Sequence, residues 1–450
     1  MTIADTPAGP PASAGGPPTE GPPTGGPPTE GRPAEGPPAE GPLAEGPSAE
    51  GRPTKGLGRD WRHLWGSGAL STLGDGALVA AMPLLAAATT SDPLLVSGVT
   101  TAATLPWLLL SLPAGAWVDR FDRRRLLMAA QAVHVLLITV LALLVTLGAA
   151  RIWMLFVLAF GVGAAGLVVT GASEALIVSV VPKTELETAN GRRVATESVL
   201  REFGGPPLGS ALFALAMPAP FWLDAVMFLL ALLMITRIRA DGAVGRTRPR
   251  GPMLAEIGEG LRWLARNRLP RTLVLIAGAG NFCETMALAT LVLFARDVLG
   301  VGDGGYGVLV AAMAVGGVVG GMVAGRVVAR LGGRSVALGM QLAIPLSWLA
   351  IALAGRNAVT VVALFTVFSL AVALWNVMSS SLRQRLIPAE LLGRVGGAGR
   401  MIAFGAIPLG AVCGGLVADA YGLVAPWFVC AVLRLLVSLL AWPALRRWEG

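Results

Sequence analysis

Long stretches without a charged side chain are the feature that most limits how this chain can fold. Residues 93–118 contain no Asp, Glu, Lys or Arg, and none occurs between Arg125 and Arg151. An apolar run of about 20 residues is long enough to cross the hydrocarbon core of a bilayer as a helix. Since 54% of all residues are hydrophobic and only 14% are charged, we expect a multi-pass membrane protein rather than a soluble domain.

Twelve such stretches can be placed after residue 60, so the predicted fold is all-α. Their predicted ranges are 63–88, 95–117, 126–148, 152–180, 192–216, 219–237, 272–296, 304–328, 334–354, 358–381, 396–418 and 422–444. An even number puts both termini on one side. Loops on that side hold most of the Lys and Arg, whereas the opposite loops hold only Arg151, Arg296 and Arg356. This bias predicts cytoplasmic termini in a protein of the cell (plasma) membrane.

The chain divides into four predicted parts. Residues 1–60 form a Pro/Gly-rich tail with pentapeptide repeats, which we expect to be disordered because it lacks large apolar side chains. Residues 61–240 and 271–450 each hold six of the predicted helices. Between them, residues 241–270 form a central cytoplasmic loop with an amphipathic helix, in which Leu261 and Leu264 alternate with arginines. That helix either lies on the anionic leaflet or packs against the bundle.

The two six-helix parts resemble each other, which predicts two pseudo-symmetric bundles. A shift of 210 residues carries Gly115 onto Gly325 and Arg120 onto Arg330. Shifts of 206 and 201 residues match prolines and a glycine farther along, namely Pro182 with Pro388, Pro207 with Pro408 and Gly209 with Gly410.

A charged loop separates the first two uncharged stretches named above. Residues 115–125 read Gly-Ala-Trp-Val-Asp-Arg-Phe-Asp-Arg-Arg-Arg. This loop resembles the Gly-x-x-x-Asp-Arg-x-Gly-Arg-Arg signature between helices 2 and 3 of the major facilitator superfamily. The matching residues are Gly115, Asp119, Arg120, Arg123 and Arg124. Asp122 stands where the family usually has Gly, and we expect it to cap the following helix.

The resemblance implies a transporter whose substrate binds near the midplane, between two six-helix halves that rock around it. It also implies a gate at the cytoplasmic face. We expect Asp119 to meet the start of helix 11, and Arg120 or Arg123 to reach Glu174 in helix 4.

Charged and amide side chains inside the predicted spans are candidates for proton coupling and for the substrate pathway. Asp75 and Glu284 lie midway along helices 1 and 7, and the 210-residue shift takes Asp75 to within one residue of Glu284. Carboxylates at that depth are costly and are functional candidates by default. The alternative is a structural pair with a buried cation. The other pathway candidates are Arg201, Glu202, Asn281 and Asn376.

Small residues in helix 5 predict close helix packing. Gly205, Pro206 and Gly209 resemble part of the Gly-Pro-x-x-Gly-Gly signature of antiporters, although Ser210 replaces the last Gly. His134 is expected to be structural, because no partner at ligand spacing is evident. The three cysteines also lack metal-ligand spacing. We therefore expect no metal and no cofactor.

Three further segments are similar to the drug and siderophore exporter branch of the superfamily: residues 73–76, 259–264 and 295–300. That similarity implies export of a bulky, partly apolar small molecule in exchange for protons. Alternatives are a proton-coupled importer of a small solute and a transporter-like sensor or scaffold. An enzyme is not expected without a nucleophile or metal set, nor is direct use of ATP without a phosphate-binding loop. Expected partners are the substrate, protons and the bilayer, for a monomer that binds no nucleic acid.

Overall fold

The computed structural model of this chain describes residues 57–239, 253–388 and 391–447. Most of the tail predicted for residues 1–60, and much of the central loop, lie outside the described residues. Within the described ranges the regular structure is helical, without strands.

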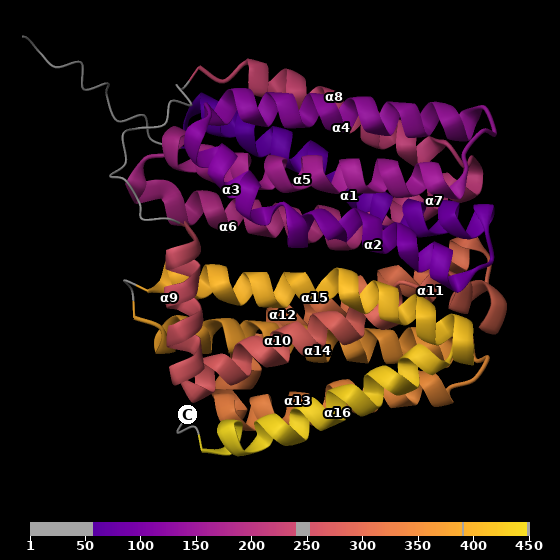
Figure 1. Cartoon of the computed structure of the whole chain (residues 1–450), viewed down its shortest axis with the longest axis vertical. Helices are drawn as coiled ribbons and strands as arrows, with labels where there is room; N and C mark the ends of the chain where they lie inside the picture. Colours follow the sequence, from indigo (N-terminus) through magenta and orange to yellow (C-terminus); the bar gives the residue numbers. More distant parts are fainter. Residues whose placement is uncertain (1–56, 240–252, 389–390, 448–450) are drawn as a thin grey trace, which may run out of the picture. The chain divides into compact units, whose positions relative to one another are not determined.

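Figure 1 shows the helices of the first half in indigo to magenta and those of the second half in orange to yellow. The first half contains α1 (Gly58–Thr89), α2 (Pro93–Leu109), α3 (Ser111–Arg120), α4 (Arg123–Thr146), α5 (Ile152–Val180), the short η1 (Lys183–Glu185), α6 (Leu186–Glu197), the π-helix η2 (Ser198–Gly204), α7 (Gly205–Leu215) and α8 (Ala219–Thr236). The central loop contributes α9 (Met253–Arg266). The second half contains α10 (Arg268–Leu288), α11 (Leu291–Leu293), the π-helix η3 (Phe294–Val298), α12 (Asp303–Leu331), α13 (Gly333–Leu353), α14 (Ala358–Leu386), α15 (Leu392–Tyr421) and α16 (Ala425–Arg446).

Nine helices of the described part are long and apolar enough to cross a membrane, or ten if the bent segment from α10 to η3 is one span. The other two predicted spans are broken helices. The range 95–117 divides into α2 and α3 at Leu110, and the range 192–216 divides into α6, η2 and α7. The architecture is therefore compatible with twelve crossings.

Prolines account for two of these breaks. Pro113 has no N–H to donate to the carbonyl of Leu109, and the chain breaks between them at Leu110. Pro206 and Pro207 likewise follow η2, where the helix widens into π turns before it continues as α7. Because neighbouring helices surround such breaks, the freed carbonyls need not face lipid.

The halves contact each other chiefly through two pairs of helices, α2 with α15 and α7 with α12, with smaller contacts of α12 with η2 and of α1 with α11 and α12. In the first pair Ser97 lies against Gly415, and in the second Ser210 lies against Gly307. A methyl group on either glycine would overlap the serine hydroxyl. Ser97 and Gly307 are 210 residues apart, and Ser210 and Gly415 are 205 apart. The same contact is thus made twice with serine and glycine exchanged, which is what a pseudo-twofold relation between the halves requires.

These contacts lie toward one end of the helices, here called the far end, where α1 ends and α16 begins. A hydrogen bond from Arg296 Nη1 to the carbonyl oxygen of Ala87, at 2.9 Å, also joins the halves there. At the opposite, terminal end, α3 packs against α2, α4 and α5 of its own half.

The arginine-rich loop ties together helix ends of the first half. Asp122 accepts a hydrogen bond from the backbone N–H of Arg125 at 2.7 Å and caps α4, as predicted. Arg123 donates to the carbonyl of Ala175, near the end of α5, at 3.2 Å. Arg124 donates to the carbonyl of Thr236, at the end of α8, at 2.7 Å. Cations are favourable at helix C-termini, because unpaired carbonyls gather there.

The central helix α9 packs against α10 and α15 of the second half. Its Leu261, Trp263 and Leu264 join an apolar cluster with Val395 and Ala398 of α15. The exposed arginines of this segment, Arg262, Arg266 and Arg268, point elsewhere. The apolar face of α9 therefore packs against the helix bundle.

Small residues bring α1 and α7 close together. Gly205, Pro206 and Gly209 are all buried at this contact. A Cβ on Gly205 would overlap the backbone of Gly76, and a Cβ on Gly209 would overlap the carbonyl of Ala77. Backbone atoms cannot move aside as a flexible side chain can, so this contact requires glycine.

We therefore expect Gly209→Ala to destabilise the folded protein by at least about 1 kcal/mol, the lower part of the range for overpacked sites. Thermal unfolding of the purified protein in detergent measures this. The matched control is Gly166→Ala on α5, where a Cβ would meet no atom within 4 Å. Equal melting temperatures for the two variants would contradict a tight contact between α1 and α7.

Candidate functional site

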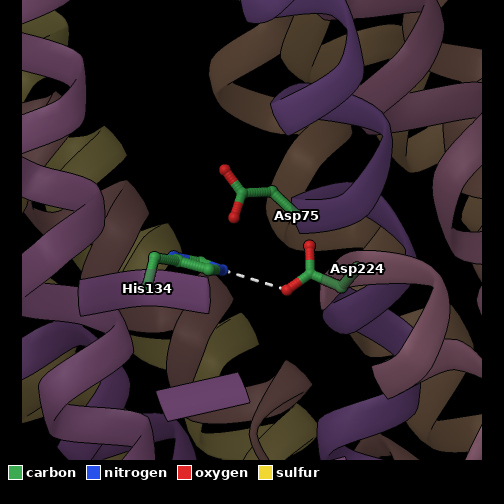
Figure 2. A group of neighbouring side chains, drawn as sticks. All are labelled: Asp75, His134 and Asp224. Carbon is green, nitrogen blue, oxygen red and sulfur yellow. Dashed lines mark hydrogen bonds and ion pairs between the residues drawn. The ribbon is translucent and has the colours of Figure 1, made fainter. Parts of the chain in front are cut away.

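Three ionisable side chains from three different helices meet inside the first half. Asp75 comes from α1, His134 from α4 and Asp224 from α8 (Figure 2). His134 Nε2 lies 2.9 Å from Asp224 Oδ2. One polar atom from each residue lies within 4.8 Å of the other two. Groups that can bind a proton or a cation thus converge from α1, α4 and α8.

Local packing fixes the orientation of this cluster. The His134 ring stacks on Phe228, one turn beyond Asp224 on α8, with ring centroids 3.5 Å apart and planes 5° from parallel. Gly74 makes room for Asp224, because a Cβ there would overlap the carboxylate. Asp75 is the next residue along α1. Gly74 therefore leaves space for the carboxylate of Asp224, and Asp75 contributes a second carboxylate.

The cluster is partly buried and partly open. The side chains of His134 and Asp224 are 0% exposed, whereas Asp75 is half-buried. Asp224 Oδ1 and His134 Nδ1 have no hydrogen-bond partner among the described residues. Figure 2 shows that second oxygen of Asp224 turned away from His134, on the side of Asp75. A buried acceptor without a donor is costly, so this oxygen marks a place where a proton or a polar ligand would be stabilised.

Asp75 also lines a cleft between α1, α5, α6 and η2, with both polar and apolar side chains in its walls. The cleft has a volume of about 80 Å³, enough for several water molecules at about 10–15 Å³ each. Its walls include Thr72, Ser173, Arg193 and Arg201. Asp75 therefore stands between a cleft that can hold water and the buried pair behind it.

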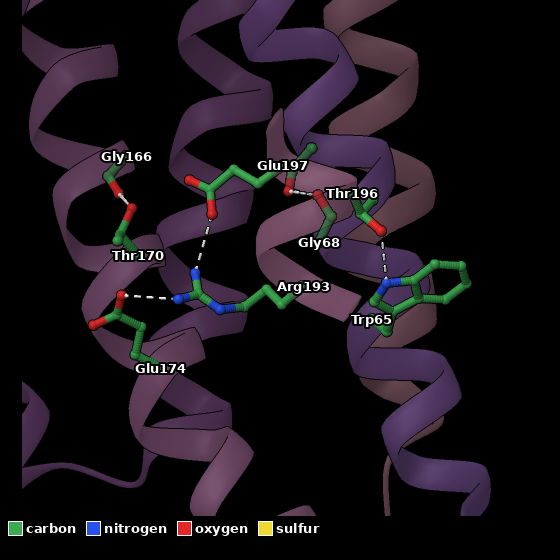
Figure 3. A network of polar contacts seen from close by, with 9 residues as sticks. Trp65, Gly68, Gly166, Thr170, Glu174, Arg193, Thr196 and Glu197 are labelled. Carbon is green, nitrogen blue, oxygen red and sulfur yellow. Dashed lines mark hydrogen bonds and ion pairs between the residues drawn. The ribbon is translucent and has the colours of Figure 1, made fainter. Parts of the chain in front are cut away.

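A network of polar contacts shapes the wall of this cleft (Figure 3). Arg193 of α6 lies 3.1 Å from Glu197 on the same helix and 3.6 Å from Glu174 on α5. Trp65 Nε1 donates to Thr196 Oγ1 at 3.0 Å and joins α1 to α6. These bonds connect the broken helix that contains α6 to both α1 and α5.

In this structure Glu174 lies beside another arginine, and its contact with the arginine-rich loop of a closed cytoplasmic gate stays a prediction. Glu174 pairs with Arg193, because α6 brings that arginine alongside α5. Arg123 instead binds backbone and hydroxyl oxygens of the last turn of α5, including Ser179 Oγ at 3.1 Å. Arg120 is exposed, Gly115 lies half-buried in α3, and the side chain of Asp119 lies outside the described residues.

Of the predicted pathway residues in the first half, Arg201 is brought into the cleft beside Asp75. It lies in η2, and the side chain of its neighbour Glu202 lies outside the described residues. Two others lie in the second half. Asn281 of α10 donates to the carbonyl of Ala403 on α15 at 2.8 Å, and Asn376 is exposed on α14.

The second half has its own buried polar group, around Arg434 of α16. This arginine is 2% exposed, and its Nη1 donates to the carbonyl of Ile276 on α10 at 2.9 Å. One turn later, Ser438 donates to Gln341 Oε1 of α13, also at 2.9 Å. The charge of Glu284 acts on Arg434.

The two polar groups occupy repeat-related places. Gly74 faces Asp224 in the first half, and Gly280 faces Arg434 in the second. These glycines are 206 residues apart, whereas the 210-residue shift was the one that related Asp75 to Glu284. The packing therefore matches Asp75 with Asn281, which lies about one turn before Glu284 on α10. One constant shift fails because the segments between helices differ in length between the halves.

Asp224 and Arg434 are absent from the predicted site residues, although Asp224 is the lone charged residue of α8 and Arg434 is the lone charged residue of α16 before Arg446 in its last turn. The rule that identified Asp75 would have found both. His134 was interpreted as a structural residue without a partner. Its contact with Asp224 spans 90 residues, and nothing in the spacing along the chain signals it.

Comparisons with known proteins agree with this architecture. A family model described as "Transmembrane secretion effector" matches residues 58–449. The chain is 28% identical to a protein named multidrug efflux pump Tap from Mycolicibacterium fortuitum, over 82% of this chain and 91% of that protein. Among solved structures, it resembles a point mutant of the nucleoside transporter NupG with a TM-score of 0.70 and 11% identity, covering 86% of this chain and all of the other.

It also resembles a bacterial homologue of the iron transporter ferroportin in an inward-facing state, with a TM-score of 0.63 and 19% identity. That match covers 85% of this chain and 98% of the other. At these identities the solved structures show the fold alone, whereas the family model spans nearly all of the described chain. The chain therefore belongs to the transmembrane secretion effector family of major facilitator superfamily transporters, and it is a membrane transporter rather than an enzyme.

Proposed function

We propose that this transporter exports a bulky, partly apolar small molecule in exchange for protons, by alternating access, with Asp75 as the group that carries the coupled proton. The observation that carries the proposal is the position of Asp75. It lies on α1 between a cleft that can hold water and the buried His134–Asp224 pair. A proton can reach the carboxylate from the cleft, and its arrival changes the charge of a cluster that joins three helices.

Export, rather than import, is supported by the relative named multidrug efflux pump, which matches along most of both chains. Plasma-membrane placement with both termini in the cytoplasm is supported by the excess of Lys and Arg in the loops at the terminal end. With this orientation the contacts of Ser97 with Gly415 and Ser210 with Gly307 lie on the outer side, and the contact of α2 with α15 continues inward to Trp107 and Phe404. The arrangement then corresponds to a state closed to the exterior.

Asp75 is preferred to Glu284 on the basis of neighbouring charge. The charge of Glu284 acts on the buried guanidinium of Arg434, whose charge is fixed. The cation nearest Asp75 in the cluster is a histidine already paired with a second carboxylate, Asp224. Asp75 therefore stands among groups that can exchange a proton, whereas Glu284 stands beside one that keeps its charge.

We expect Asp75→Asn to abolish substrate flux driven by a pH gradient while the protein still reaches the membrane. Everted vesicles under an imposed pH gradient, offered a panel of fluorescent lipophilic drugs, measure this. Exchange of labelled for unlabelled drug without a gradient should continue, because Asn keeps the shape of the side chain. The control is Glu187→Gln, an exposed carboxylate on α6.

Gradient-driven flux in Asp75→Asn at the wild-type rate would contradict the role of Asp75. A wild-type protein that moves none of the drugs with either direction of gradient would contradict proton-coupled export as a whole. Gradient-driven uptake into right-side-out vesicles would favour the importer.

For Glu284→Gln we expect the opposite pattern. Flux should remain dependent on the pH gradient, whereas the melting temperature in detergent should fall, because Arg434 keeps its buried charge and loses a nearby carboxylate. The matched variant is Asp75→Asn, which removes one carboxylate from the other half. Loss of coupling in Glu284→Gln without loss of stability would transfer the proton-carrying role to the second half.

We further propose that the arginine-rich loop, with Asp119, acts as the cytoplasmic gate, where Asp119 would stabilise the start of α15 when that side closes. A carboxylate at a helix N-terminus contributes roughly 0.3–1 kcal/mol. This gate is closed only in the outward-open state, so its loss favours the inward-open state.

Asp119→Asn is therefore expected to slow turnover without changing which drugs are transported. Cysteine pairs introduced at the cytoplasmic ends of α3 and α15, in a background without the native cysteines, report closure by crosslinking. The control is Asp122→Asn, which retains a side-chain oxygen able to cap α4. Unchanged crosslinking together with normal transport in Asp119→Asn would leave the loop with a role in topology alone.

A further inference from the structure

The buried His134–Asp224 pair has a second role beyond joining α4 to α8. We infer that these two residues set the pH range over which Asp75 binds and releases its proton, so that the titrating cluster belongs to the first half alone. This inference rests on the proposed function, because it assumes that Asp75 is the proton carrier. His134 and Asp224 act here as positioning residues through the charge that they hold beside Asp75.

Asp75 faces charged groups from several helices. From α4 and α8, the spans contribute only His134 and Asp224 near the cluster. From α6 and η2, Arg193, Glu197 and Arg201 face Asp75 across the cleft, where water screens them. The packed helices α2 and α7 carry no charged residue, and the one carboxylate of α5, Glu174, is exposed and lies 3.6 Å from Arg193. The pair is thus the nearest charge that lies out of water.

Position gives this pair its influence on Asp75. Both side chains are 0% exposed, and interactions between charges are stronger where water does not screen them. The charge of Asp75 acts on both members of the pair. The stack of His134 on Phe228, and the space left by Gly74 for Asp224, hold the pair in one geometry. A change in the charge of the His134–Asp224 pair therefore acts on Asp75 at short range.

The count of charges gives the sign of the effect. With His134 protonated and Asp224 ionised, the pair is neutral overall, and the cluster changes from −1 to 0 when Asp75 takes up a proton. Without the imidazolium, the same step runs from −2 to −1. A carboxylate beside a second, unpaired carboxylate holds its proton more tightly, so release then requires a higher pH.

The second half shows which feature is special to the first. The 210-residue shift relates α4 to α13 and takes His134 to the buried Ile344, Asp224 to Arg434, and Gln131 to Gln341. An isoleucine side chain carries no charge, and arginine keeps its charge at all physiological pH values. The framework of the two groups is shared, but only the first contains residues whose charge can change near neutral pH.

The test compares the pH dependence of transport in two variants. His134→Gln removes the cation and keeps a hydrogen-bond donor for Asp224. The double variant His134→Gln with Asp224→Asn removes both charges and keeps two polar side chains of similar size. Initial rates of drug flux in everted vesicles are measured against the pH on each side, with exchange without a gradient as the measure of folded protein.

We expect His134→Gln to move the pH of half-maximal flux upward by about one unit, which corresponds to tenfold tighter proton binding. The double variant should return to within a few tenths of a unit of wild type, because the cluster again changes from −1 to 0. The control is Gln131→Met, one turn earlier on α4, which removes the buried hydrogen bond to Ser67 at 3.2 Å without changing charge. Its pH profile should match wild type.

An unchanged profile in His134→Gln, with coupling intact, would overturn the inference and leave the proposed function standing. So would an equal shift in Gln131→Met, because packing alone would then explain it. If wild-type flux ignores the pH gradient, the proposed function itself fails, which separates the two cases. Should His134→Gln not accumulate in the membrane, His134→Asn makes the same change of charge with a shorter side chain.

Discussion

An ionised side chain in the hydrocarbon of a bilayer has no water to solvate it, and this cost decides where the charges of the membrane spans lie. Asp224, His134 and Arg434 are almost completely buried within their own halves. Each finds its partner on another helix, so α4 is joined to α8, and α16 to α10. Charged side chains that are costly to expose to lipid therefore form the contacts that hold these helices together. A cluster required for packing is also one whose protonation can change packing.

The two halves share a framework but differ in chemistry. Small residues repeat at the places where backbones approach. Gly209 lies against the carbonyl of Ala77, as Gly410 lies against that of Phe282. The buried residues at the repeat-related places differ, with His134 and Asp224 in one half, and Ile344 and Arg434 in the other. A duplicated scaffold of this kind can keep its packing while one copy takes up a titrating role. The helices of the other copy then need only a fixed charge.

Much of the fold could be predicted from the sequence, because lipid imposes a length and a hydrophobicity that can be read locally. The twelve predicted ranges all fall on helices, and the capping role of Asp122 follows from its position before α4. The site could be predicted only in part. Asp75 was found because a carboxylate in an apolar helix stands out, and the same rule applied to Asp224 would have found it too. The partner of His134 lies 90 residues away along the chain, and the partner of Glu174 depends on where α6 lies. Neither contact has a local signal in the sequence.

The two ends of the transporter differ in the interactions that hold the halves together. This difference determines whether the binding of one proton can shift the balance between the two states. At the far end, the halves meet through uncharged contacts of Ser97 with Gly415 and Ser210 with Gly307, and through one hydrogen bond from Arg296. A hydrogen bond contributes about 0.5–1.5 kcal/mol net, because water replaces it when it opens. At the terminal end, the bonds of Arg123 and Arg124 stay within the first half, so they are kept when the halves separate. A tenfold change in proton affinity corresponds to about 1.4 kcal/mol, which is similar to the hydrogen bond that must open. On the proposed mechanism, protonation of a single carboxylate is therefore of the right size to shift the balance between the two states, provided that its effect reaches α1, the helix that carries both Asp75 and Ala87.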